Sequence, residues 1–151
     1  MSPESERIKI LLVEDDAGDV RLLREAMKDA GPWCDLTVAT NGAQALDMLF
    51  RRGMYSRFEL PAIVLLDIRL PILSGHEVLH AIKSNSRLSP LPVIILSTSQ
   101  APEDVRRAYA LGASCYIVKP PDLEQFVAIC NSLHDFWTKR VTLPVADAAA
   151  S

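Results

Sequence analysis

Short apolar runs recur along the chain, separated by longer stretches of mixed apolar and polar residues. Such runs are typical of buried strands, because a strand covered on both faces needs apolar side chains at nearly every position. The runs at 62–67 and 92–97 are almost continuously apolar, which favours a parallel sheet. The pattern predicts strands at 8–13, 36–39, 62–67, 92–97 and 114–119.

The stretches between these runs place apolar residues three and four positions apart, which indicates amphipathic helices. We expect the first helix to end at Gly31-Pro32. Asp122, with Gln125 three positions later, predicts a capping box at the start of the last helix. Helices are expected around 20–30 and 45–49 and over 75–85, 103–111 and 122–138. The segment 51–61 is expected to be an irregular surface loop.

The alternation of strands and helices predicts an α/β fold in which helices cover both faces of one parallel sheet. A length of 151 residues fits one domain. We expect this domain over residues 7–138, an N-terminal extension at 1–6 and a C-terminal tail at 139–151. In open sheets of this kind, ligands bind outside the carboxyl ends of the strands.

Charge and composition narrow the classes of function. The formal net charge of −3 and the lack of a basic run argue against binding to nucleic acid. No apolar stretch is long enough to span a membrane, and the polar N-terminus lacks the apolar core of a signal peptide. Three cysteines without metal-ligand spacing are typical of reduced thiols, so we expect a cytoplasmic protein.

Polar groups capable of chemistry follow the predicted strands. Asp67 ends an apolar run, and a carboxylate buried there without partners would be costly. The carboxyl ends of parallel strands meet at one edge, so groups at the other strand ends can supply partners. Those groups are Glu14, Asp15, Asp16, Ser97, Thr98, Ser99 and Lys119. The sequence therefore predicts carboxylates, hydroxyls and one lysine at a single edge of the sheet.

Clustered carboxylates repel one another unless a cation neutralises them, and Mg²⁺ prefers carboxylate oxygens. We expect Asp15 and Asp67 to bind Mg²⁺ directly and Glu14 to act through water. The backbone carbonyl of Arg69 would complete the protein's share of the ligands. The alternative role for Glu14 and Asp15 is to cap the N-terminus of the following helix, which is also the role that we expect for Asp16. The alternative role for Asp67 is that of a structural carboxylate at the end of a strand.

The same groups suit the transfer of a phosphoryl group. Asp67 can attack phosphorus and form an acyl phosphate. Lys119 and Mg²⁺ would neutralise charge on the phosphoryl oxygens, and Ser97 would hydrogen-bond to one of them. The alternatives are a turn hydroxyl for Ser97 and an ordinary surface lysine for Lys119.

Four motifs carry a resemblance to a known family. VEDD, LLDIRLPILSG, IILSTS and YIVKP, in this order, resemble the receiver domain of two-component response regulators over residues 7–137. The resemblance implies a flavodoxin-like (βα)5 fold with sheet order 2-1-3-4-5. It implies that Asp67 is the phospho-acceptor, that Ser97 is the switch hydroxyl and that Pro120 follows a cis peptide bond. Tyr116 falls at the switch aromatic position, although a core role also suits it. The remaining functional residues that the resemblance implies are Glu14, Asp15 and Lys119.

Three further segments resemble one subfamily, the small stand-alone regulators paired with cyanobacterial and bacterial phytochrome histidine kinases. They are VEDDAGDVRLLREAM, RRGMYSRFELP and LHDFWTKRVTLP. The resemblance implies a phytochrome-type sensor histidine kinase as phosphodonor and a homodimer. Helical spacing turns Phe136 inward with Leu133 and leaves Trp137 as extra apolar surface, so Phe136 and Trp137 either pack the helix or contact a second copy. Ser97 departs from the commoner threonine but keeps the hydroxyl.

We therefore expect a switch that binds partners and is not an enzyme, with no DNA-binding domain after it. The alternatives are a phosphorelay intermediate and a binding module that does not depend on phosphorylation. An aspartate-nucleophile phosphatase is disfavoured because Arg69 stands where a general acid is needed. A flavin-binding module is disfavoured because the acidic loop at 14–19 would repel a phosphate.

Overall fold

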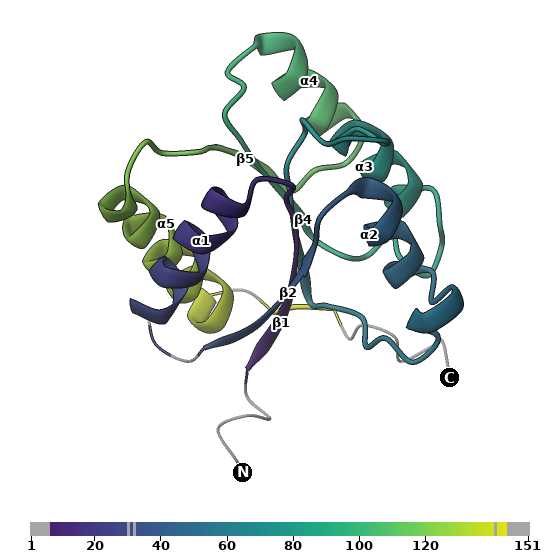
Figure 1. The fold of residues 1–151 in the computed structure, drawn as a ribbon, viewed down its shortest axis with the longest axis horizontal. Coiled ribbons are helices and arrows are strands. Elements are labelled where there is room, and N and C mark those ends of the chain that lie inside the picture. Colours follow the sequence, from purple (N-terminus) through teal and green to yellow (C-terminus); the bar gives the residue numbers. More distant parts are fainter. Residues whose placement is uncertain (1–6, 30, 32, 141, 145–151) are drawn as a thin grey trace.

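A computed structural model of the chain describes residues 7–29, 31, 33–140 and 142–144 (Figure 1). The strands are β1 Ile8–Val13, β2 Cys34–Ala39, β3 Ile63–Leu66, β4 Val93–Ser97 and β5 Cys115–Val118. The helices are α1 Ala17–Asp29, α2 Gly42–Leu49, α3 Gly75–Lys83, α4 Pro102–Ala110 and α5 Leu123–Asp135. The predicted extension at 1–6 lies outside the described residues, as do residues 141 and 145–151 of the predicted tail.

All five strands are parallel and lie in the order β2-β1-β3-β4-β5, which confirms the predicted flavodoxin-like fold. Every residue of the central strands β3 and β4 is buried, as continuous apolar runs require. The edge strand β5 is only half-buried. The register pairs Val13 with Leu66 and Ser97 with Val118, so neighbouring strands end at nearly the same level.

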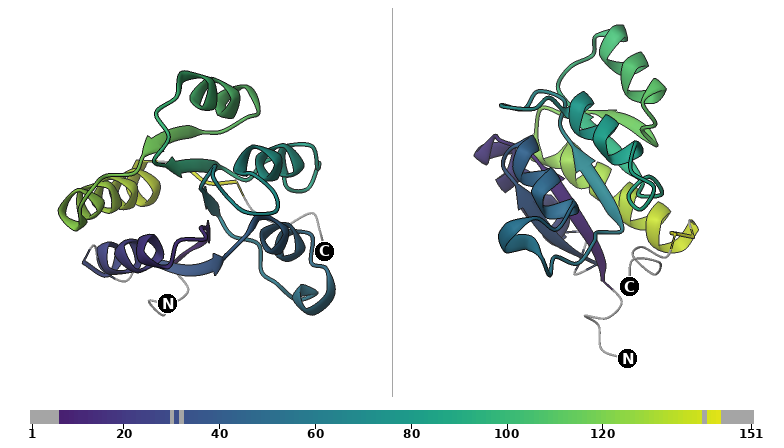
Figure 2. Two further views of the ribbon diagram at one scale, coloured as in Figure 1. Left: turned by 45° about the horizontal axis from the view of Figure 1, so that its top comes forward. Right: turned by 90° about the vertical axis from the view of Figure 1, so that its right-hand side faces the viewer.

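Helices cover the sheet in two layers (Figures 1 and 2). The pair α1 and α5 lies on one face, and α2, α3 and α4 lie on the other. The β1 side chains alternate between two cores: Ile10 and Leu12 pack with α1 and α5, and Leu11 and Val13 pack with α2 and α3. The sheet is thus fixed from both sides, and this holds its carboxyl edge in place.

Several predicted boundaries change in the structure. β2 begins at Cys34, two residues early, because it pairs with β1 along its whole length. The segment 51–61 is not wholly irregular, since Gly53–Tyr55 forms a 3₁₀ turn. The Asp122 carboxylate caps α5 by accepting from the Gln125 N–H, but the Gln125 side chain contacts this same carboxylate, so the predicted capping box is incomplete.

The first helix ends close to its predicted stop, at Asp29, whereas Ala30 and Pro32 lie outside the described residues. The predicted cis bond before Pro120 is wrong, because the described residues contain no cis peptide bond and trans is the lower-energy isomer for most X–Pro bonds. No helix in the described part of the chain combines the length and apolar character that a membrane span needs.

The last helix buries Phe126 and Leu133 of the expected inner face Phe126, Ile129, Leu133 and Phe136, but Cys130 and Trp137 take the places of the other two. Its core residues are Phe126, Cys130, Leu133 and Trp137, with Trp137 in a π-helical turn that continues α5 over Phe136–Arg140. Trp137 is only 9% exposed, whereas Phe136 is 52% exposed. The expectation that Phe136 points inward and Trp137 remains as extra surface is therefore reversed.

Candidate functional site

The carboxyl edge of the sheet brings the predicted acidic residues together. Glu14 directly follows β1 and Asp67 directly follows β3, two strands that are neighbours in the sheet. The Asp67 N–H donates to the Val13 carbonyl at 3.1 Å, which extends the hydrogen-bond ladder between β1 and β3 to Asp67 itself. Glu14 and Asp67 are both buried, and Asp15 is exposed.

Gly75 allows the chain to turn tightly after Asp67. A Cβ atom at Gly75 would lie 2.2 Å from the Asp67 carbonyl oxygen and 2.6 Å from the Ile68 Cα. The Gly75 N–H also donates to the Ile68 carbonyl at 2.8 Å. Only glycine lets α3 begin this close to the strand end, and this contact fixes the backbone that carries Asp67.

Lys119 is the centre of the charged cluster. Its ammonium donates to both Glu14 carboxylate oxygens at 2.9 and 3.0 Å and to Asp67 Oδ2 at 3.0 Å. It also donates to Asp19 Oδ2 at 2.8 Å. The Lys119 side chain is 6% exposed, so the alternative of an ordinary surface lysine is wrong.

Asp19 is a partner that the sequence analysis missed. It lies in the first turn of α1, where an acid is expected near the helix N-terminus for electrostatic reasons alone. Asp16, as expected, caps this helix by accepting from the Asp19 N–H at 3.0 Å. The position of Asp19 in the first turn of α1 is a sequence signal that places it near this edge, but that signal alone does not predict the contact with Lys119.

The titration of these groups reflects burial and mutual charge. Burial, followed by the hydrogen bond with Asp67, raises the pKa of Glu14 to about 8. Burial also acts to raise the pKa of Asp67, but the hydrogen bond with Glu14 and the charge of Lys119 outweigh it, so that the pKa of Asp67 is lowered overall. Burial also opposes the charge on Lys119, yet its bonds to Asp19 and Glu14 raise its pKa. The cluster therefore holds one carboxylate readily as an anion and resists a second.

Such a cluster has the donors for a hard divalent cation. Glu14, Asp15 and Asp67 each offer one carboxylate oxygen, and these oxygens lie within 4.8 Å of one another. Oxygen ligands from a few carboxylates, completed by water, are what Mg²⁺ takes in proteins. The Arg69 N–H donates to Asp67 Oδ1 at 3.3 Å, and this hydrogen bond orients the Asp67 carboxylate next to the carboxylates of Glu14 and Asp15.

An open hollow of about 550 Å³ lies over the cluster. It is lined by Glu14, Asp15, Asp16, Ala17, Gly18, Asp19, Asp67, Thr98 and Lys119. From the loop after β4, Thr98 lines this hollow, whereas Ser97 is fully buried and its Oγ accepts from the Ser99 N–H at 3.3 Å. Thr98 is a second residue that the sequence analysis left without a role.

Tyr116 is tied to the loop that follows β4. Its hydroxyl donates to the Ser99 carbonyl at 2.8 Å, and its ring packs against the core formed with α2, α3 and α4. Tyr116 is half-buried, so it is neither a fully enclosed core residue nor a free surface group.

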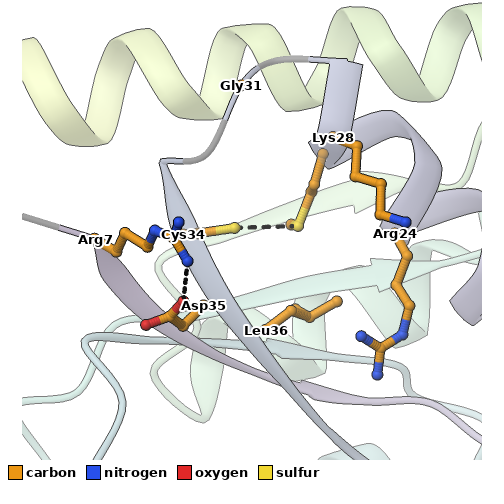
Figure 3. A pocket seen from close by; sticks show the side chains of 8 residues that line it. Arg7, Arg24, Lys28, Gly31, Cys34, Asp35 and Leu36 are labelled. Carbon is orange, nitrogen blue, oxygen red and sulfur yellow. Dashed lines mark hydrogen bonds and ion pairs between the residues drawn. The ribbon is translucent and has the colours of Figure 1, made fainter. Parts of the chain in front are cut away.

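Another hollow, of about 480 Å³, lies away from this edge, beside α1 and the start of β2 (Figure 3). Arg7 donates to Asp35 there at 3.1 Å, and the Cys34 thiol lies 3.5 Å from the Met27 sulfur. Burial raises the pKa of Cys34 to about 11, which keeps the thiol protonated. The lining of this hollow lacks the acidic cluster that lies at the carboxyl edge of the sheet. The candidate functional site is therefore the one at the carboxyl edge.

The fold and this edge define a class of protein. Residues 10–131 match the family described as the response regulator receiver domain, and the chain belongs to that family. Receiver domains are signalling proteins.

Individual relatives resemble the chain over nearly its whole length. Response regulator Rcp1 of Synechocystis sp. is 38% identical over 147 residues, which cover 97% of this chain and 100% of Rcp1. The phosphorylated cyanobacterial phytochrome response regulator RcpA has 37% identity and a TM-score of 0.86, over 91% of this chain and 99% of RcpA. The Mn²⁺-bound form of Rcp1 has 36% identity and a TM-score of 0.84, over 91% of this chain and 99% of that structure.

Proposed function

We propose that this chain is a response regulator that accepts a phosphoryl group on Asp67. The observation that carries the proposal is the buried Lys119 ammonium, which joins Asp67 Oδ2 to Glu14 and Asp19 at hydrogen-bond distances. Phosphorylation of a carboxylate adds negative charge beside it. A lysine held next to a strand-end carboxylate can neutralise this added charge.

The transfer would proceed by attack of an Asp67 carboxylate oxygen on phosphorus. An O–P bond forms, the bond from phosphorus to a nitrogen of the donor histidine breaks, and the imidazole leaves with the electron pair of that bond. Lys119 would neutralise charge on a phosphoryl oxygen, and Ser97, or Thr98 from the lining of the hollow, would donate a hydrogen bond to another. Burial of Asp67 favours the attack because it leaves little bulk water around the nucleophile.

Mg²⁺ is the cation that we assign to the acidic cluster. Asp15 and Asp67 would bind it directly, Glu14 would contribute through water, and the Arg69 carbonyl would complete the protein's share. When bound, Mg²⁺ supplies charge neutralisation for the phosphoryl oxygens. The closeness of the three carboxylate oxygens supports this assignment, as does the Mn²⁺-bound form of Rcp1.

A phytochrome-type sensor histidine kinase is the proposed phosphodonor. The support is the similarity to Rcp1 and to the phytochrome response regulator RcpA over more than nine-tenths of this chain. We place the protein in the cytoplasm with that kinase. A homodimer is proposed through the face that carries Phe136, whose aromatic ring is exposed.

Phosphorylation would act as a two-state switch. It adds roughly −1.5 to −2 charge at the edge of the sheet. Movement of Ser97 toward the phosphoryl group would draw the loop after β4 inward, and Tyr116 would follow because its hydroxyl is bonded to Ser99. The changed surface would bind a partner; transfer of the phosphoryl group to a further protein is the alternative output.

Phosphotransfer from a purified phytochrome-type kinase tests this proposal. The kinase is first labelled on its histidine with radioactive ATP and then mixed with the wild-type chain, with Asp67→Asn or with the control Asp29→Asn, which alters an exposed acid at the end of α1. We expect label to move to the wild type and the control but not to Asp67→Asn. Label on Asp67→Asn would overturn the assignment of the acceptor.

A further inference from the structure

Asp19 supplies one of the three carboxylates that surround the Lys119 ammonium in the described part of the chain. Asp19 Oδ2 accepts from Lys119 Nζ at 2.8 Å, whereas the two Glu14 oxygens and Asp67 Oδ2 lie at 2.9, 3.0 and 3.0 Å. The Asp19 side chain is 30% exposed, compared with 3% for Glu14 and 8% for Asp67. Two partners of the ammonium are therefore enclosed, and the third, Asp19, reaches solvent.

The backbone of Asp19 is fixed independently of Lys119. Its N–H donates to Asp16 Oδ1 at 3.0 Å at the start of α1. One turn later, Leu23 is buried in the core that α1 shares with α5. These contacts hold the first turn of α1 beside the carboxyl edge of the sheet, so Asp19 offers Lys119 a carboxylate on a rigid element.

Asp19 differs from the other two partners in its part in the proposed reaction. Asp67 would accept the phosphoryl group and bind the cation, and Glu14 would hold a water ligand of the cation. Both would then share their oxygens with a second charged group. Among the described residues, the three acids whose carboxylate oxygens meet closely enough for one cation are Glu14, Asp15 and Asp67, and Asp19 is not one of them. Asp19 can thus keep its bond to Lys119 throughout the transfer.

The donors of Lys119 are fully used by these carboxylates. An ammonium has three N–H groups, and Glu14, Asp19 and Asp67 accept from Lys119 in the structure. A phosphoryl oxygen on Asp67 would need one of these donors. The bond to Asp67 is the one that can be exchanged, because the phosphoryl oxygens would take over the negative charge there.

We propose that Asp19 is a positioning residue that holds the Lys119 ammonium in place while Lys119 exchanges its bond to Asp67 for a bond to a phosphoryl oxygen. The inference rests on the proposed function and deepens it. Asp19 acts through Lys119 and does not touch the phosphoryl group. A long lysine side chain that is already fixed by one partner loses less freedom in the transition state, so the reaction is faster.

The charge of Asp19 taken alone predicts the opposite effect. A carboxylate beside the site repels an anionic phosphodonor, and its removal would then accelerate phosphorylation. Asp19 is paired with Lys119 at 2.8 Å, so its charge is largely neutralised and positioning should dominate. The direction in which the rate changes distinguishes the two effects.

The test is the initial rate of adduct formation with acetyl phosphate at saturating Mg²⁺, followed by intact-protein mass spectrometry. Acetyl phosphate is a small donor, so the docking of a kinase on α1 does not enter. We expect Asp19→Ala to lower the rate by about tenfold, through loss of one charge-assisted hydrogen bond. Asp19→Asn keeps an oxygen that can accept from Lys119 and should restore the rate to within about threefold of the wild type.

Glu25→Ala is the matched control, because it removes an exposed acid from the same helix away from the edge. It should leave the rate unchanged. Asp19→Ser should be as slow as Asp19→Ala, since its hydroxyl is too short to replace the carboxylate, and it decides if Asp19→Ala fails to fold.

Two further readouts separate positioning from a general loss of stability. In EDTA, the ammonium protons of ¹⁵N-labelled Lys119 should exchange with water faster in Asp19→Ala than in the wild type or Glu25→Ala, because they lose an acceptor. In the Lys119→Met background, Asp19→Ala should not slow phosphorylation further, since its effect passes through the ammonium.

An Asp19→Ala rate equal to or above that of the wild type would overturn the role of Asp19, as would an additional loss of rate when it is combined with Lys119→Met. Unchanged exchange of the Lys119 protons would overturn it as well. A wild type that forms no adduct at all would instead overturn the proposed function, so the two failures are distinguishable.

Discussion

The Lys119 ammonium lies 3.0 Å from Asp67 Oδ2, and both side chains are more than nine-tenths buried. Buried ion pairs stabilise a fold little in total, but removal of one partner leaves the other charge buried and uncompensated. Lys119→Met should therefore lower the free energy of unfolding by about 3 kcal/mol, measured by urea denaturation without Mg²⁺. Lys139→Met, which removes an exposed lysine paired with Asp135, should change it by less than about 0.5 kcal/mol. Equal effects of the two substitutions would contradict the central place of Lys119.

The raised pKa of Glu14 predicts how Mg²⁺ binding depends on pH. The unfolded chain releases the Glu14 proton near the ordinary pKa of 4.5, whereas the folded protein without Mg²⁺ retains it up to about 8. Because the folded protein holds the Glu14 proton more tightly than the unfolded chain does, this proton stabilises the fold at low pH. That stabilisation is lost as pH rises from about 4.5 through about 8. Mg²⁺ competes with that proton, so it should raise the melting temperature more at about pH 9 than at about pH 6.

Differential scanning fluorimetry with EDTA or MgCl₂ at the two pH values gives this comparison. In Glu14→Gln the group no longer titrates, and the Mg²⁺ effect should become nearly independent of pH. A larger Mg²⁺ effect at the lower pH would show that the proton on Glu14 does not compete with the cation.

Gly75→Ala should damage both the fold and the site, because the added Cβ would lie 2.2 Å from the Asp67 carbonyl oxygen. We expect a loss of about 3 kcal/mol in the free energy of unfolding and slower phosphorylation by acetyl phosphate in the fraction that folds. Gly53→Ala is the control, since Gly53 has a φ of +55° but no atom within 4 Å of the added Cβ. It should cost only about 1 kcal/mol, from backbone strain. A cost for Gly75→Ala as small as this would mean that the turn after Asp67 relaxes freely.

The two neighbouring aromatic residues after α5 should behave differently. Trp137 is buried in the core with α1, so Trp137→Ala should lower the free energy of unfolding by about 3 kcal/mol. Phe136 is half-exposed, and Phe136→Ser should leave the monomer's stability nearly unchanged but weaken the proposed homodimer. Light-scattering mass over a range of concentrations measures the second effect. A wild type that stays monomeric, or a dimer that Phe136→Ser leaves intact, would refute the role of Phe136.

The strands and the convergence of Glu14, Asp67 and Lys119 could be predicted from the sequence. Continuous apolar runs mark strands buried on both faces, and parallel strands bring their carboxyl ends to one edge. β2 was predicted too short because Cys34 and Asp35 gain their strand conformation from pairing with β1, which no local pattern records.

The remaining details depend on geometry that the sequence does not encode locally. Asp19 reaches Lys119 only because α1 packs at a particular angle on the sheet. Whether Ser97 or Thr98 faces the hollow depends on where β4 ends, and it ends at Ser97. Trp137, four residues after the buried Leu133, joins the core in place of Phe136, and both aromatic residues lie in the π-helical turn Phe136–Arg140. The proposed roles of Arg69, Ser97 and Tyr116 in phosphoryl transfer and switching remain predictions.

Phosphorylation of Asp67 is the central claim, and incubation with acetyl phosphate tests it most directly. Wild type and Asp67→Asn are compared by intact mass spectrometry with Mg²⁺ and with EDTA. The account predicts one phosphoryl adduct in the wild type that requires Mg²⁺, is removed by hydroxylamine and is absent in Asp67→Asn. An adduct that persists in Asp67→Asn, or a folded wild type that forms none, would make Asp67 a structural carboxylate and leave a binding module that does not depend on phosphorylation.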